Sequence, residues 1–127
     1  MKALFLTPLS VLFLLGGCSP YESDAIKEFI PGTYVRAAQH EFGIEYDTLV
    51  ITLQNKSARQ HDILRKWRYD RVLDGTPLEP EYKQQKTSGL YNAAKKVLQE
   101  TETFELFTFD PEKGLLFNGT NRYTKLK

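Results

Sequence analysis

From residue 32 to the end of the chain, short alternating or apolar runs are separated by turn residues roughly every 8 to 12 positions. The clearest run covers residues 46–54, where Leu49, Ile51 and Leu53 share one face of an extended strand. A strand with one apolar face needs neighbouring strands and a core that buries this face. The spacing is typical of all-β sandwiches and barrels, so we expect an all-β domain.

The pattern predicts about eight strands in succession, joined by short turns. The expected strands cover residues 33–36, which continue toward residue 40, and residues 46–54, 60–72, 84–92, 96–100, 103–109, 114–118 and 121–126. A meander of this length must close on itself or cover its edges. The predicted fold is therefore a small antiparallel up-and-down meander, a closed or partly open barrel, formed by residues 32–127 as a single domain.

Two segments between these strands have helical character. Residues 91–100 contain a run of Ala and Lys with helical propensity, but both flanks alternate. We therefore expect a hairpin there, with its turn at residues 92–95. Residues 80–82 follow a turn and are expected to form a short helical turn before the chain re-enters the sheet.

A short polar segment precedes the β-domain. Ser23 is a suitable cap for one helical turn over residues 24–29, which Pro31 would end. We interpret residues 18–31 as a tether that carries this helical turn.

The first 17 residues have the pattern of a secretory signal peptide, with Lys2 before an apolar run over residues 4–15. This run is shorter than the about 20 apolar residues that a membrane-spanning helix needs. The residues that follow resemble the lipobox of bacterial lipoproteins: Leu15, Gly16, Gly17 and Cys18. The resemblance implies cleavage after residue 17, a diacylglycerol thioether on Cys18 and acylation of the new amino group. Cys18 is the only cysteine, so it has no disulfide partner.

The lipobox resemblance also implies a location in the cell. Several acyl chains, each contributing about 0.8 kcal/mol per buried methylene, make an effectively permanent membrane anchor. Ser19 stands after the cysteine, where enterobacterial lipoproteins that stay in the inner membrane have aspartate. We therefore expect a lipid-anchored protein of the cell envelope, in the outer membrane, on either its periplasmic or its surface face.

The charge balance excludes some classes of partner. Without Lys2 the 17 basic residues become 16, against 16 acidic ones, so the mature chain has no net charge. Such a balance offers no field that would steer a polyanion. The third strand does combine bases with Trp67 and Tyr69, which can bind single-stranded nucleic acid. Alternation nevertheless predicts a core Trp67 with an exposed basic face, and we expect no nucleic-acid partner.

The start of the β-domain resembles lipocalin-like (calycin) barrels. Gly32 and Tyr34 match the Gly-x-Trp signature of their first strand, with Tyr in place of Trp, and a short helical turn precedes both. In that family a late arginine packs over the signature ring, and Arg122 is the matching residue here. Residues 30–36 and 45–51 are also similar to small uncharacterised lipoproteins of Bacteroidetes-type bacteria, a resemblance that implies no activity.

No arrangement of residues predicts catalysis, a cofactor or a metal. The sequence lacks a nucleophile elbow, a phosphate loop and a paired-cysteine site. His40 with Glu41 and His61 with Asp62 offer metal-ligand types, but without a fixed mutual geometry. Two carboxylates for glycoside hydrolysis must face one cleft, whereas Glu41, Glu45 and Asp47 are interpreted as an exposed hairpin connection. We expect a protein that is not an enzyme.

Arg65 is the one residue that contradicts the core pattern. Alternation places it between Ile63 and Trp67 on the inward row of the third strand. Because a buried unpaired guanidinium costs several kcal/mol, a carboxylate must meet it, a bulge must turn it outward, or the interior must be wet. Glu102 and Glu105 are the candidate partners. A wet interior would create a ligand pocket lined by Arg65, Trp67, Tyr69 and Tyr91.

Three functions remain open. The first is a non-catalytic envelope lipoprotein whose barrel binds another envelope component or assists assembly. The second is a lipocalin-like carrier of a small apolar or aromatic ligand. The third is an envelope inhibitor or immunity protein that makes contact through exposed loop residues such as Glu79 and Glu81.

Overall fold

The computed structural model describes residues 24–54 and 59–127. The lipobox residues 15–18, the expected cap Ser23 and residues 55–58 lie outside the described part of the chain. The elements in order are α1 (Ala25–Phe29), β1 (Gly32–His40), β2 (Gly43–Leu53), β3 (Gln60–Leu73), β4 (Thr76–Pro77), β5 (Glu81–Asn92), β6 (Val97–Glu100), β7 (Leu106–Asp110), β8 (Leu115–Asn118) and β9 (Asn121–Lys125).

The strands form one closed antiparallel barrel. Each barrel strand pairs with the next along the chain, β9 returns to pair with β1, and β4 pairs only with the end of β3. With β4 outside the barrel, eight strands close as an up-and-down meander. The predicted all-β fold is confirmed, and the closure removes most of the open edges that a meander would otherwise have.

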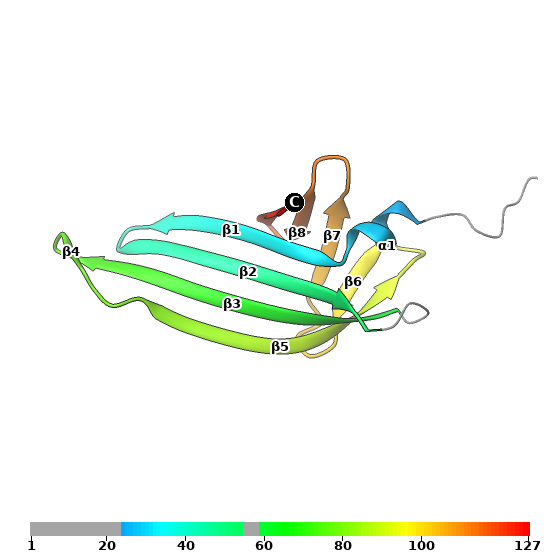
Figure 1. Cartoon of the computed structure of the whole chain (residues 1–127), viewed down its shortest axis with the longest axis horizontal. Helices are drawn as coiled ribbons and strands as arrows, with labels where there is room; N and C mark the ends of the chain where they lie inside the picture. Colours follow the sequence, from blue (N-terminus) through cyan, green and yellow to red (C-terminus); the bar gives the residue numbers. More distant parts are fainter. Residues whose placement is uncertain (1–23, 55–58) are drawn as a thin grey trace, which may run out of the picture.

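Four barrel strands are much longer than the other four. β1, β2, β3 and β5 have 9, 11, 14 and 12 residues, whereas β6 to β9 have 4 or 5. β9 reaches β1 only at Tyr34 and Val35, and β6 reaches β5 only from Gly89 to Asn92. The long strands therefore continue past the barrel as a curved four-stranded sheet (Figure 1). We call this sheet the blade; it comprises residues 36–47, 65–73 and 81–87.

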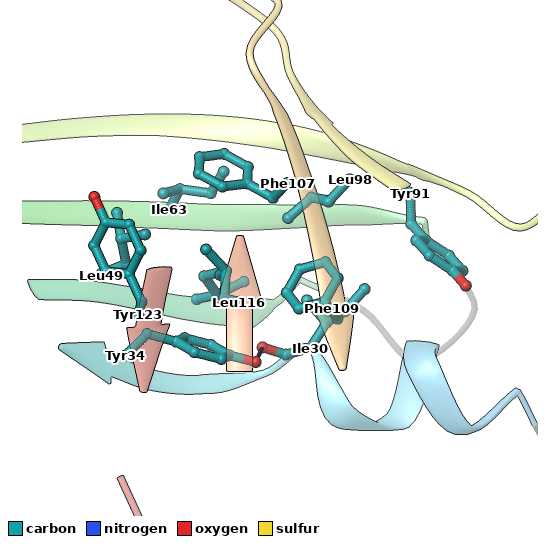
Figure 2. Close-up of a cluster of buried hydrophobic side chains, with 11 residues drawn as sticks. Ile30, Tyr34, Leu49, Ile63, Tyr91, Leu98, Phe107, Phe109, Leu116 and Tyr123 are labelled. Carbon is teal, nitrogen blue, oxygen red and sulfur yellow. Dashed lines mark hydrogen bonds between the residues drawn. The ribbon is translucent and has the colours of Figure 1, made fainter. Parts of the chain in front are cut away.

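The barrel itself is filled by a packed apolar core (Figure 2). Its buried members come from the residue that follows α1 and from every barrel strand: Ile30, Tyr34, Leu49, Ile51, Ile63, Tyr91, Leu98, Phe107, Phe109, Leu116 and Tyr123. Tyr34 donates its hydroxyl to the carbonyls of Phe29 and Ile30 at 3.0 and 2.8 Å, so its polar atom is satisfied inside the core. The interior of the barrel is therefore packed with side chains.

The helix α1 closes the end of the barrel opposite the blade (Figure 1). Asp24 caps it by accepting the backbone N–H groups of Ile26 and Lys27 at 3.0 and 3.1 Å. The same carboxylate accepts the Tyr91 hydroxyl at 2.8 Å, which joins the helix to β5. The helix was expected, but its cap is Asp24, one residue later than predicted. Among the described residues, no helix has the length and hydropathy of a membrane span.

The hairpin predicted at residues 92–95 is confirmed. The Asn92 side chain accepts the backbone N–H groups of Ala94 and Lys95, both at 3.0 Å, which fixes the turn. The helical turn expected at residues 80–82 is wrong, because β5 begins at Glu81 and pairs with the long strand β3 from there.

The strand expected at residues 103–109 begins only at Leu106. Phe104 has φ of 62° and donates its N–H to the Glu100 carbonyl, so the preceding residues form a turn.

A cation lies beside the Tyr34 ring, but it is not the predicted one. Arg122 was the expected partner of the Tyr34 ring, but it is exposed because its side chain points outward from β9. Lys125 takes that place, with Nζ 4.2 Å from the Phe29 ring centroid and 5.8 Å from that of Tyr34. A Cβ on Gly32 would collide with the Lys125 side chain, so the glycine makes room for this cation.

Candidate binding site on the blade

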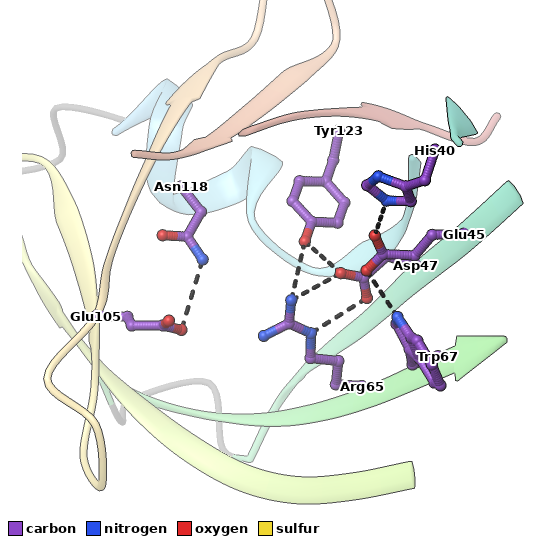
Figure 3. Close-up of polar contacts among 8 residues, drawn as sticks. All are labelled: His40, Glu45, Asp47, Arg65, Trp67, Glu105, Asn118 and Tyr123. Atoms are coloured by element: carbon purple, nitrogen blue, oxygen red, sulfur yellow. Dashed lines mark hydrogen bonds and ion pairs between the residues drawn. The ribbon is translucent and has the colours of Figure 1, made fainter. Parts of the chain in front are cut away.

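The inner face of the barrel continues onto the blade, where its side chains become polar and aromatic. On β2, Glu45 and Asp47 continue the row of Leu49, and on β3, Trp67 continues the row of Arg65. No short strand covers this part of the described sheet, so the side chains of Glu45 and Arg65 reach water, with 21% and 34% exposed, whereas Asp47 stays fully buried. Figure 3 shows these residues facing one another across the blade.

Arg65 lies at the boundary between core and blade and binds Asp47 with two hydrogen bonds. Its Nε and Nη2 donate to the two oxygens of Asp47 at 3.1 and 2.7 Å. Tyr123 donates its hydroxyl to the same carboxylate at 2.7 Å. The hydrogen bonds to Asp47 raise the pKa of Arg65, and burial raises that of Tyr123. Of the three alternatives for Arg65, a partner carboxylate is the correct one.

The partner of Arg65 is not one of the predicted carboxylates. Glu105 instead accepts a long hydrogen bond of 3.5 Å from Asn118 (Figure 3). Glu102 is exposed in the turn before β7. The sequence pointed to a later strand, whereas the barrel pairs β3 with β2 and so brings Asp47 to Arg65.

Glu45 connects two side chains on the inner face. It binds His40 Nε2 at 2.8 Å and accepts the Trp67 indole N–H at 2.6 Å. The hydrogen bond to His40 and, less strongly, that from Trp67 hold the pKa of Glu45 below its ordinary value, although burial opposes this. The interpretation of these carboxylates as an exposed hairpin connection is wrong for Glu45 and Asp47, whose side chains are 21% and 0% exposed.

Trp67 lies between an aromatic and a cationic neighbour. Tyr69 stacks on it with ring centroids 5.7 Å apart and planes at 28°, and Lys83 Nζ lies 5.1 Å from its centroid. Trp67 was expected in the core, but it is half-buried on the blade because β3 extends past the short strands. The predicted basic face is real: Lys66 and Arg68 are exposed on the opposite side of β3.

These side chains surround an open hollow of about 730 Å³, which we call the inner hollow. Its lining residues are Glu45, Arg65, Trp67, Lys83, Gln84 and Gln85. A second hollow of about 500 Å³, the outer hollow, lies on the other face and is lined by Tyr46, Thr48, Lys66, Trp67, Arg68, Tyr82, Lys83 and Gln84. Both hollows use the first half of β5, of which the sequence pattern assigned only the residues from Gln84 onward to a strand.

Three of the four residues of the predicted pocket come together on the blade. Arg65, Trp67 and Tyr69 lie on one face of β3, whereas Tyr91 is buried in the core and bonded to Asp24. Lys83, Gln84 and Gln85 were missed as lining residues. Residues 81–86 are almost all polar and show no alternation that would mark an inner face, so the pattern gave no signal for these positions.

The described side chains form no arrangement suited to metal binding. No group of three or more His, Cys, Asp or Glu side chains gathers in this part of the chain. His40 lies near the tip of the blade, bonded to Glu45. His61 is fully buried inside the barrel, with Nδ1 3.1 Å from the Arg59 carbonyl and no hydrogen-bond partner for Nε2 among the described residues.

The fold and the site describe a small closed β-barrel that carries open polar and aromatic hollows on a protruding blade. No family model matches the chain, and comparisons with curated proteins and with solved structures find no significant match.

Proposed function

We propose that this protein is a lipid-anchored, non-catalytic binding protein of the cell envelope, which holds a partner against its blade. The observation that carries the proposal is the inner hollow, where Glu45, Arg65 and Trp67 are held in place by hydrogen bonds to one another or to the strands beside them. A surface whose side chains are already ordered loses less entropy when a partner binds.

Two further features favour a macromolecular partner over a small carried ligand. The barrel interior is occupied by its own apolar side chains, whereas a carrier needs an enclosed cavity. The tip of the blade exposes apolar side chains: Phe42, Val72, Leu73 and Leu78 are 56%, 40%, 53% and 38% exposed. Exposed apolar groups gathered at one end of a molecule are typical of interaction sites.

The proposed anchor orients the blade. The tether from Cys18 to the start of α1 at Ala25 spans at most about 25 Å when fully extended. Because α1 closes the end of the barrel opposite the blade, a lipid on Cys18 would hold that end near the membrane (Figure 1). The blade would then project away from the bilayer, toward a partner.

A protruding blade also suits the third function, an envelope inhibitor that inserts its tip into another protein. Glu79 and Glu81 both lie near this tip and are exposed, although Glu81 pairs with Arg71 at 3.5 Å. In that case the residues around the tip, rather than the inner hollow, would make the main contact.

Site-specific photocrosslinking in the source cells tests the proposal. A benzophenone amino acid at Gln85, in the inner hollow, should give a discrete crosslinked product. The same group at Glu112, which is exposed in the turn after β7, is the matched control and should give no discrete crosslinked product. Equal products at both positions, or none at Gln85, would disprove binding at the hollow.

The anchor has its own test. Palmitate should label the wild-type protein and leave Cys18→Ala unlabelled, and the variant should leave the membrane fraction. Equal labelling of both proteins would refute lipidation of Cys18.

A further inference from the structure

One edge of the blade has backbone groups without a partner strand. β5 pairs with β3 from Glu81 to Leu90, but its other side meets β6 only from Gly89 onward. Figure 1 shows β5 along the margin of the blade, away from the short strands. In the described part of the chain, β5 is therefore an open edge from Glu81 to Lys86.

The hydrogen bonds at the end of β5 show which groups point outward. Tyr91 donates its N–H to Arg59 on the β3 side, and Ser88 accepts the Thr101 N–H on the β6 side. Backbone groups of alternate residues in an antiparallel sheet point to opposite sides. The N–H and C=O groups of Tyr82, Gln84 and Lys86 therefore point to the open edge.

The two hollows lie on either side of this edge. Lys83 and Gln84 line both of them, the inner hollow together with Trp67 and Arg65 and the outer hollow together with Tyr82. Side chains of a strand alternate between the two faces of its sheet. A strand added along β5 would thus place successive side chains in the two hollows, while its backbone bonds give affinity.

The charges around the edge determine what kind of strand fits. Nearby carboxylates are already engaged: Glu81 with Arg71, Asp70 with Arg68, Glu45 with His40 and Trp67, and Asp62 with Gln54. In contrast, Lys66, Lys83 and Lys86 form no ion pair among the described residues. The edge therefore has a surplus of positive charge on both faces.

We propose that the open edge of β5 binds an acidic, extended segment of a partner polypeptide as an added antiparallel or parallel β-strand. This proposal rests on the proposed function and names the chemistry of the partner. A second copy of the chain fits less well, because two β5 edges would bring Lys83 and Lys86 of both copies together. The lysines discourage pairing with neutral or basic strands and admit an acidic one.

A display library of random peptides of about ten residues, long enough to cover an edge strand, tests this proposal. The full lipidated chain in detergent is the target. Selection should enrich acidic peptides with alternating β-branched residues. A synthetic copy of an enriched peptide, with methyl groups on the alternate backbone nitrogens that face the protein, should bind at least about tenfold more weakly because its strand bonds are lost.

Two substitutions of one residue supply the matched comparison. Gln84→Pro removes the N–H that points to the open edge without removing a bond to β3, and should weaken binding at least about tenfold. Gln84→Ala keeps that N–H and should bind the peptide clearly more tightly than Gln84→Pro does. The circular dichroism and melting temperature of both variants check that they fold. If Gln84→Pro does not fold, the binding of the methylated peptide to the wild-type protein still tests the proposal.

Several outcomes would overturn the proposal. They are enrichment of basic or apolar peptides, no enrichment at all, and binding that is indifferent to both the methyl groups and Gln84→Pro. If the wild-type protein forms dimers and Gln84→Pro dissociates them, a second copy of the chain occupies the edge. If the edge proposal fails while the crosslink at Gln85 persists, the proposed function stands and the partner binds the hollow in another way.

Discussion

Arg65 and Asp47 form a paired contact in which only one partner reaches water. Two hydrogen bonds of 3.1 and 2.7 Å join them, yet the Asp47 side chain is 0% exposed and that of Arg65 is 34% exposed. The pair lies where the packed barrel ends and the blade begins. Removing Arg65 and removing Asp47 therefore have different costs in stability. Only the loss of Arg65 leaves a fully buried charged group without its partner.

Arg65→Met should lower the free energy of unfolding by about 3–5 kcal/mol, because it leaves a buried carboxylate without its cation. Combining it with Asp47→Leu should recover most of this loss, since an apolar pair replaces the ion pair. Urea unfolding followed by circular dichroism measures both. A double variant as unstable as the single one would contradict the structural role of the pair.

Lys125 and Arg122 make a matched test of the cation that packs against Phe29 and Tyr34. Lys125→Met removes the cation over the Phe29 ring and its hydrogen bond to the Phe29 carbonyl, and should cost about 1–2 kcal/mol of unfolding free energy. Arg122→Met changes an exposed residue and should stay within about 0.5 kcal/mol. Chemical denaturation of both variants checks this, and the reverse order would restore Arg122 as the packing cation.

His61 makes stability depend on pH. Burial lowers the pKa of His61 below its ordinary value of 6.5. Above that pH both the folded and the unfolded chain carry a neutral ring. As the pH falls below 6.5, the unfolded chain takes up the proton first, so stability falls by up to about 1.4 kcal/mol per pH unit until the lowered pKa is reached.

Urea unfolding at about pH 7.5 and about pH 5.5 measures this dependence. The wild type should lose stability between the two, and His61→Leu should lose clearly less, although it starts lower because it lacks the contact with the Arg59 carbonyl. An identical pH dependence in both proteins would show that other groups are responsible.

The blade should open more readily than the barrel. Ile63 and Trp67 lie on the same strand, and their N–H groups point to the same neighbour, β5. Ile63 is buried in the core, whereas Trp67 is only half-buried on the blade. In native-state hydrogen exchange, the Trp67 amide should exchange at least about tenfold faster than that of Ile63. Equal rates would mean that blade and barrel open only together.

The strands themselves were predictable because alternation is a local signal. Leu49 and Ile51 share one face wherever residues 46–54 form a strand, and the alternation on both flanks of residues 92–95 favoured a hairpin over the helix that the Ala and Lys run suggests. The signal failed at Glu81, where a polar segment became a strand because the long partner β3 offered it backbone hydrogen bonds. The alternation pattern also could not predict that Trp67 lies beyond the core, because its position relative to the core depends on where the other strands end.

The sequence by itself determined the all-β class, the inward row of Ile63, Arg65 and Trp67, and the need of Arg65 for a partner. Only the tertiary structure decided that the partner is Asp47 and that the inward row leaves the core after Arg65. The reason is physical. Alternation sets the face to which a side chain points, whereas the register between strands and the unequal lengths of β3 and its neighbours set what covers that face.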